Sequence, residues 1–327
     1  MGSAPGRRSP TGPGSPSAVP GCWKRRGPVG GAGRGVRPRF VVAGVVAAVT
    51  AVVVTAALLV DGDDVVQPAA PAVPAALTDA DLKGMSAREL LERAAHAVEG
   101  RPAAAEPRAK QWIYTKEAPD GAKEFLEHLS DDARAPERWI RYDGRAMALE
   151  KRTGAGREAE LQVTGTDMEN ETENGGEQDD GRSPREMYRL LAGLPTDAEG
   201  ALEALREANA VPDDKDRSQA HNDYQEIAAL LRAGVKPPEG LAGLYRALAM
   251  LPRLDVVGHL VEDAVGRRVV ALRYSGNDSG DEHVEREWLI DPGTYEVVGL
   301  RTLRDGEVAT GDSTVTVAVV DEPGERG

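Results

Sequence analysis

The stretch from Glu285 to Glu307, EREWLIDPGTYEVVGLRTLRDGE, decides the fold class. Apolar and polar residues alternate in it, the pattern breaks at Asp291-Pro292-Gly293, alternation resumes, and it breaks again at Asp305-Gly306. Such alternation is typical of half-buried strands, and Asp-Gly favours a tight hairpin turn. The stretch therefore predicts antiparallel strands joined by short turns.

Strand patterns surround this stretch in two sets. In the last part of the chain, five strands are expected at residues 255–261, 268–274, 284–290, 294–303 and 313–320. Four earlier strands are expected at residues 111–117, 137–142, 145–152 and 158–164. Because the links between successive strands are short, an antiparallel meander is favoured.

Helical signals precede and separate the strand sets. Ser86 and Glu89 have the spacing of a capping box at the start of a helix expected over residues 87–98. Further helices are expected at residues 184–192, 197–209, 219–233 and 238–250. The predicted fold class is α+β, with a large curved antiparallel sheet, an N-terminal helix and an inserted helical block, preceded by one transmembrane helix.

The beginning of the chain differs in composition from the rest. Residues 1–39 hold eight basic side chains and no acidic one, whereas the following residues hold 32 basic and 54 acidic ones. Residues 40–60, FVVAGVVAAVTAVVVTAALLV, carry no charge and as a helix would span about 31 Å, close to the hydrocarbon core of a bilayer. We expect an anchor in the lipid bilayer with a cytoplasmic N-terminus, because basic flanks stay inside. The alternative is a cleaved signal peptide, with Ala70-Pro71-Ala72 as its cleavage site.

These signals divide the chain into four parts. Residues 1–39 are expected to be a disordered basic cytoplasmic tail, 40–60 the transmembrane helix, 61–85 a Pro/Ala-rich linker and 86–327 an extracytoplasmic α+β domain. Within that domain we expect an acidic mobile loop at 166–182, the helical block at 184–250 and a C-terminal β-meander at 254–320. Calcium is the alternative reading of the acidic loop, although its carboxylates match no calcium-binding frame.

No constellation of residues indicates catalysis. The spacing of the five histidines places no two of them on one metal, and no nucleophile or phosphate-binding motif occurs. His259 is expected in a strand, as a core or edge residue, and His96, His128, His221 and His283 on the surface. We predict a protein that is not an enzyme and needs no metal or cofactor, with a hydrolase as the remaining alternative. The acidic exterior also argues against nucleic acid as a partner.

Aromatic side chains are the best candidates for a binding site. If the sheet curls, one of its faces could close against helices as an apolar cleft lined by some of these rings. The alternative is that the rings form the core. The candidate cleft residues, all expected on strands, are Trp112, Tyr114, Trp139, Trp288 and Tyr295.

Several segments carry a family resemblance, among them WIYTKE, ERWIRYDG, YRALAMLP and WLIDPGTYEVVGLRTL, and the block Leu289 to Tyr295 is the most specific. Over residues 87–321 the chain resembles uncharacterised actinobacterial single-pass membrane proteins, which are typically encoded beside extracytoplasmic-function sigma factors. That family is similar, at fold level, to the half-barrels of lipoprotein carriers and periplasmic regulators of anti-sigma factors (LolA/RseB-like). The resemblance implies a sensor or carrier domain.

Two function classes follow from these predictions. The first is a membrane-anchored extracytoplasmic binding or sensor domain, in envelope-stress or sigma-factor-linked signalling. It would hold an apolar ligand such as a lipid or lipopeptide, or a partner protein. The second is a protein–protein interaction module without a small-ligand site, whose helical block at 184–250 docks another membrane or envelope protein.

Overall fold

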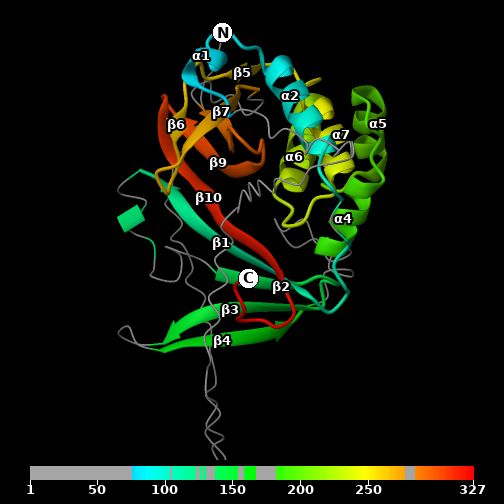
Figure 1. Ribbon diagram of the computed structural model, residues 1–327, viewed down its shortest axis with the longest axis vertical. Coiled ribbons are helices and arrows are strands. Elements are labelled where there is room, and N and C mark those ends of the chain that lie inside the picture. Colours follow the sequence, from blue (N-terminus) through cyan, green and yellow to red (C-terminus); the bar gives the residue numbers. More distant parts are fainter. Residues whose placement is uncertain are drawn as a thin grey trace, which may run out of the picture. The chain divides into compact units, whose positions relative to one another are not determined.

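The computed structural model describes residues 76–103, 105–122, 126–127, 129, 137–153, 158–166, 182–276 and 284–327. All of them belong to one compact unit, Gln67–Gly327 (Figure 1). The expected cytoplasmic tail and transmembrane helix, and residues 167–181 of the expected acidic loop, lie outside the described residues. Among the helices that are described, none is long and apolar enough to cross a bilayer.

The helices begin where the capping signals predict. Ser86 Oγ accepts a hydrogen bond from the amide of Glu89 at 3.2 Å, and Ser183 Oγ accepts one from the amide of Glu186 at 3.2 Å. These side chains satisfy amides that have no partner within the first turn of a helix. The described helices are α1 (Asp79–Leu82), α2 (Ala87–Glu99), α4 (Pro184–Ala192), α5 (Ala198–Ala208), α6 (Gln219–Leu231) and α7 (Pro238–Leu248).

The described strands form one large antiparallel sheet, as predicted. They are β1 (Trp112–Gly121), β2 (Glu137–Arg141), β3 (Ala146–Thr153), β4 (Glu158–Gly165), β5 (Leu254–Val256), β6 (Val261–Glu262), β7 (Arg268–Tyr274), β8 (Val284–Ile290), β9 (Val297–Arg304) and β10 (Glu307–Val320). Their order is β4-β3-β2-β1-β10-β9-β8-β7-β5, and β6 pairs with β7. β1 and β10 thus join two meanders, and the sheet is not closed because β4 and β5 each have one neighbour.

Strand alternation gives the sheet two faces. Leu272 of β7 and Trp288 of β8 pack against α2, α6 and α7, so we call their side the helical face. The cross-strand pairs Trp288↔Leu300, Leu300↔Asp312 and Asp312↔Pro119 continue that face across β9 and β10 to β1. Since neighbouring residues of a strand point to opposite sides, Ile113 and Thr115 lie on the helical face. Trp112 and Tyr114 lie on the opposite side, the outer face.

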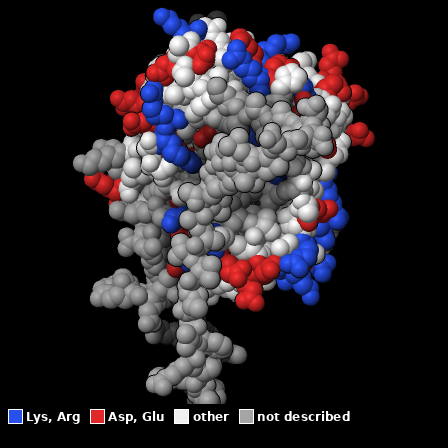
Figure 2. Space-filling view, viewed as in Figure 1, with Lys and Arg blue, Asp and Glu red and all other residues white. Residues whose placement is uncertain are grey.

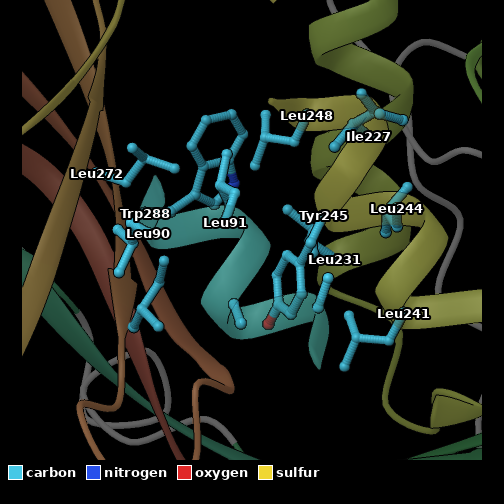
Figure 3. Close-up of a cluster of buried hydrophobic side chains, with 14 of the residues drawn as sticks. Leu90, Leu91, Ile227, Leu231, Leu241, Leu244, Tyr245, Leu248, Leu272 and Trp288 are labelled. Atoms are coloured by element: carbon cyan, nitrogen blue, oxygen red, sulfur yellow. The ribbon is translucent and has the colours of Figure 1, made fainter. Parts of the chain in front are cut away.

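The largest hydrophobic core lies between the helical face and the helices. Figure 3 shows Leu90 and Leu91 of α2 between Leu272 and Trp288 of the sheet and Tyr245 of α7. All five side chains are fully buried. At about 25 cal/mol per Å² of apolar surface removed from water, this cluster is the main source of stability for a domain whose described residues include no cysteine.

The structure differs from the sequence-based expectation in several places; the strand expected at 313–320, for example, begins at Glu307 as β10. Residues 76–85, expected in the linker, include α1, and Leu77 and Leu82 are buried in the core. The strand expected at 255–261 is split into β5 and β6, and His259 lies exposed in the bend between them. Tyr295 lies in a turn with a positive φ of 56°, two residues before β9 begins. Contacts with distant segments accompany α1 and the split strand, since the amide of Leu77 donates to the carbonyl oxygen of Pro292 and that of Leu260 to Asp79. Tyr295 instead belongs to a local turn in which its amide donates to the carbonyl oxygen of Asp291 at 2.8 Å.

Candidate functional site

The five candidate rings do not line one cleft. Trp112, Tyr114 and Trp139 form a cluster on the outer face, whereas Trp288 and Tyr295 belong to the core of the helical face. Tyr114 and Trp139 are cross-strand partners whose rings stack with centroids 5.0 Å apart. The sheet therefore separates the candidates into two groups, and all five rings are buried.

Residues 321–327, which we call the C-terminal segment, cover the outer-face cluster. Figure 1 shows the chain turning back after β10 across β2 and β3. Trp139 Nε1 donates a hydrogen bond to the carbonyl oxygen of Glu325 at 2.6 Å. The guanidinium carbon of Arg326 lies 5.6 Å from the centroid of the Trp139 ring system. The cluster is thus closed by the protein's own chain.

Two carboxylates flank Arg326. Its Nε donates to Glu137 at 2.6 Å and its Nη2 donates to Glu150 at 2.9 Å. Burial alone raises the pKa of Glu137, but hydrogen bonds from Arg326 and Lys116 outweigh burial and hold the pKa below its ordinary value. Burial and the neighbouring Glu137 raise the pKa of Tyr114 to about 12. At neutral pH the site is therefore an anionic pocket filled by a cation.

The helical-face rings are interior residues. Trp288 lies 4.7 Å from Tyr224, and Tyr224 stacks on Tyr274 at 4.2 Å, both measured between ring centroids. The main-chain oxygen of Tyr295 accepts a hydrogen bond from the hydroxyl of Tyr245 at 2.5 Å. Within the described part of the chain, the Trp288 Nε1 and Tyr224 hydroxyl groups have no hydrogen-bond partner. Trp288 and Tyr295 therefore lie in the core, which was the alternative to a cleft in the sequence analysis.

A groove with an exposed apolar wall lies elsewhere, between β10 and residues 232–237, the connector that joins α6 to α7. Its volume is about 450 Å³, and residues 234–236, 267, 296–298 and 314–319 line it. Figure 2 shows acidic and basic side chains interspersed over the described surface in view, so charge marks no single face there. The wall is marked instead by three side chains that are 39–41% accessible: Val315, Val317 and Val319.

The groove exists because the connector and the sheet meet closely at one end. A Cβ atom on Gly234 would lie 2.5 Å from Cγ2 of Ile113, so only a glycine fits at this point of contact between the connector and the helical face. The register between β1 and β10 shifts between Lys116 and Glu117, which leaves Val315 without a partner on β1. Such a bulge increases the local twist of a strand and redirects its side chains.

Charged groups stand at the same end of the groove. Lys236, one of its lining residues, donates from Nζ to the carbonyl oxygen of Ala233 at 2.7 Å, and burial lowers its pKa. Glu296, another lining residue, opposes this shift of the Lys236 pKa, and Arg267, also in the lining, lies 2.7 Å from Asp263. The groove thus combines an aliphatic wall with an end where partly desolvated charges of both signs are available.

An aliphatic row extends the groove wall across the sheet. Val319 of β10 pairs with Ile113 of β1, Ile113 pairs with Ile140 of β2, and Ile140 pairs with Met147 of β3. The sequence analysis considered only aromatic rings and missed these residues. The alternation of valine with threonine or alanine from residue 314 to 319 was the signal that could have identified the wall.

The described histidines belong to no group of potential metal ligands. No group of three or more His, Cys, Asp or Glu residues that could hold a metal occurs among the described residues. His128 and His283 lie outside that part of the chain, and His221, expected on the surface, is buried on α6. His96 is exposed and lies 3.5 Å from Glu99.

Comparison with known proteins gave no match, so the function is argued from the geometry of the structure. No protein-family model matches the chain, and no curated protein sequence matches it. The resemblance to the sigma-factor-linked membrane family therefore stays a prediction. The class that the fold defines is an open antiparallel sheet of ten strands with helices packed on one face.

Proposed function

We propose that the domain is a membrane-anchored extracytoplasmic binding module that holds an amphipathic lipid or lipopeptide in the groove beside β10. The main support for this proposal is the wall of three half-exposed valines in a groove of about 450 Å³. Pockets for small apolar ligands have volumes of about 300–1,000 Å³ and combine an apolar lining with few polar groups. The groove has this size, and its lining combines six valines with Lys236, Arg267, Glu296 and two threonines.

The chemistry of the groove favours an acyl chain with an anionic head. Covering Val315, Val317 and Val319 with an acyl chain removes their remaining apolar surface from water, which is favourable at about 25 cal/mol per Å². Lys236 lines the groove and is the cation placed to meet an anionic headgroup, since Arg267, also in the lining, is already paired with Asp263 at 2.7 Å. The lining also holds one carboxylate, that of Glu296. A curved sheet that shelters such a ligand is what the predicted similarity to lipoprotein carriers implies.

We infer the place of the domain in the cell from its sequence. The uncharged stretch at 40–60 would anchor the chain, and the basic residues before it would stay in the cytoplasm. The described domain would then face the envelope, where lipids and lipopeptides are at hand. A sensor in envelope-stress or sigma-factor-linked signalling is the role that the family resemblance supports.

Native mass spectrometry tests the ligand directly. The compact unit, residues 67–327, is purified from the native host without delipidation, as wild type and as Val317→Asp. Val163→Asp is the matched control, because Val163 is 53% accessible and lies on the outer face of the edge strand β4. We expect a lipid-sized mass on wild type and control that is lost in Val317→Asp.

The same proteins are titrated with an acyl-chain fluorophore. Saturable binding that Val317→Asp weakens about tenfold, one tenfold step being about 1.4 kcal/mol, would support the proposal. A wild-type domain without bound mass and without saturable binding would contradict it. Equal binding by the two valine variants would remove the groove as the site.

A second candidate function is docking of a protein on the same face. The observation that favours it is the aliphatic row from Val319 to Met147, beside which Leu149 of β3 is 44% accessible. A photocrosslinking residue at position 149 in membranes of the native host tests this candidate. If a protein docks there, we expect one discrete crosslinked protein. Lipid-sized adducts alone would contradict protein docking and favour the lipid-binding function.

A further inference from the structure

The outer face carries a built site for an arginine side chain, separate from the groove. Its walls are Glu137 of β2 and Glu150 of β3, and its floor is the ring of Trp139; we call these three residues the arginine pocket. Arg326 of the C-terminal segment fills it, with hydrogen bonds to Glu137 and Glu150 and its guanidinium over Trp139. Charge-assisted contacts of this kind are about twice as strong as neutral ones.

The carboxylates of the pocket are more buried than the arginine that occupies it. The side chains of Glu137 and Glu150 are 11% and 22% exposed, whereas that of Arg326 is 50% exposed. A mostly buried carboxylate is costly unless a cation accompanies it. Lys116 also lies 3.3 Å from Glu137, so Glu137 keeps one cation when the half-exposed Arg326 leaves, and Glu150 then favours a second cation in the pocket.

The C-terminal segment holds Arg326 as a short folded peptide would. Glu325 Oε2 accepts hydrogen bonds from the amides of Asp321 at 3.1 Å and Glu322 at 3.2 Å. The carbonyl oxygen of Glu325 accepts from Trp139, and Asp321 accepts from Arg108 at 2.7 Å. These contacts come from seven consecutive residues, so they could be reproduced by one segment of another protein.

We propose that the arginine pocket recognises an arginine-bearing segment of a partner protein, and that Arg326 occupies the pocket in cis as a latch. The partner binds by displacing the C-terminal segment from Trp139. Arginine rather than lysine is required, because a planar guanidinium can contact both carboxylates while stacking on an indole ring. None of the three pocket residues lines the groove, although Ala318, which does line it, also packs against the outer-face cluster.

A labelled peptide tests the pocket in the full chain, held in detergent micelles. The probe is a fluorescein-labelled copy of residues 321–327, DEPGERG, and the control peptide carries citrulline, a neutral analogue of arginine, at the position of Arg326. In fluorescence anisotropy, the Arg326→Ala chain is expected to bind the arginine peptide about tenfold more tightly than wild type does, or better. The citrulline peptide is expected to show no saturable binding.

A second substitution assigns the binding to the pocket. Adding Glu150→Gln to Arg326→Ala should lower the affinity for the arginine peptide about tenfold. Adding Glu203→Gln, which removes an exposed charge of α5 outside both the pocket and the displaced segment, should leave the affinity unchanged. Circular dichroism checks that each variant is folded. Should Arg326→Ala fail to fold, Arg326→Lys retains the cation that the carboxylates require and should still bind the peptide more tightly than wild type.

The proposal would be overturned by no saturable binding to a folded Arg326 variant, by equal binding of the arginine and citrulline peptides, or by no effect of Glu150→Gln. Dimers formed by wild type that disappear in Arg326→Ala would also overturn it, because the occupant would then be a second copy of the same chain. Loss of the groove ligand in Val317→Asp, with the peptide still bound, would separate the two sites.

Discussion

Glu226 of α6 is a carboxylate that the fold places where its charge is costly. It is 3% exposed, and its Oε1 accepts a hydrogen bond from the amide of Ala210 at 2.8 Å. Burial raises its pKa from the ordinary 4.5 to about 7, against the opposing effect of that hydrogen bond. Between these two values the folded state binds more protons than the unfolded state. Stability is therefore expected to fall as the pH rises through this range.

Replacing Glu226 should remove this dependence. Glu226→Gln is expected to raise the free energy of unfolding above that of wild type by about 1–3 kcal/mol at about pH 8 and to flatten the profile below it. Urea denaturation between about pH 5 and pH 8 measures both quantities. Glu203→Gln, on the exposed side of α5, is the charge-matched control. Identical pH profiles for the two variants would show that burial of Glu226 is not the cause.

Trp139 shows how a single side chain can serve two elements. Its ring stacks on Tyr114 of β1, and its Nε1 donates to the C-terminal segment. An aromatic side chain with both an apolar body and a polar edge is suited to such a position. The same residue therefore contributes to the core and forms the floor of the arginine pocket.

At the scale of elements, α2 and α7 are joined by a half-buried ion pair as well as by apolar packing. Arg246 of α7 donates to both carboxylate oxygens of Glu99 of α2 at 2.5 and 2.9 Å, and its side chain is 13% exposed. Arg246→Ala leaves that carboxylate without its main partner and is expected to lower the free energy of unfolding by about 2 kcal/mol.

An exposed arginine on α2 is the control for this prediction. Arg93 bonds Glu89 one turn away, with both side chains about half exposed, and Arg93→Ala should cost less than about 0.5 kcal/mol. Urea denaturation of the two variants measures the difference. Equal losses of stability in the two variants would show that the ion pair between Arg246 and Glu99 adds nothing to the apolar packing of α2 against α7.

The hairpin between β9 and β10 depends on the Asp305-Gly306 turn. Both residues have a positive φ, 54° and 81°, which is the backbone of a tight hairpin turn. Gly306→Ala is expected to destabilise the protein by about 1 kcal/mol, because side chains disfavour this conformation. Gly258→Ala, at an open site without a positive φ, is the control. Thermal unfolding compares the two, and a Tm loss at Gly258 as large as at Gly306 would contradict the assignment.

At the scale of the whole molecule, the proposed topology can be tested with one thiol. Cys22 is the single cysteine of the chain, in the segment predicted to be cytoplasmic. Val265 is 45% exposed in the domain predicted to be outside. In intact cells a membrane-impermeant maleimide should label a Cys22→Ser, Val265→Cys variant and leave wild type unlabelled. Labelling of wild type in intact cells would contradict the predicted cytoplasmic position of Cys22. Lysed cells, in which both proteins should be labelled, provide the positive control.

Much of the fold could be predicted because its signals are local. Ser183 and Glu186 mark the start of α4 within four residues, and Asp305-Gly306 marks a hairpin within two. The candidate site could not be predicted in the same way. Val319 forms part of the groove wall only because the connector around Gly234 lies nearby, and no short pattern contains that proximity.

What the sequence determined by itself was the large antiparallel sheet, the helices between its two strand sets and the turns that connect them. These features follow from alternation, capping and turn residues, whose physical effects act over a few neighbours. Only the tertiary structure decided that the candidate rings lie on opposite faces and that Glu325 caps Trp139, 186 residues away. Such contacts depend on which strands become neighbours, here β2, β1 and β10, and that order is decided by the packing of the whole domain.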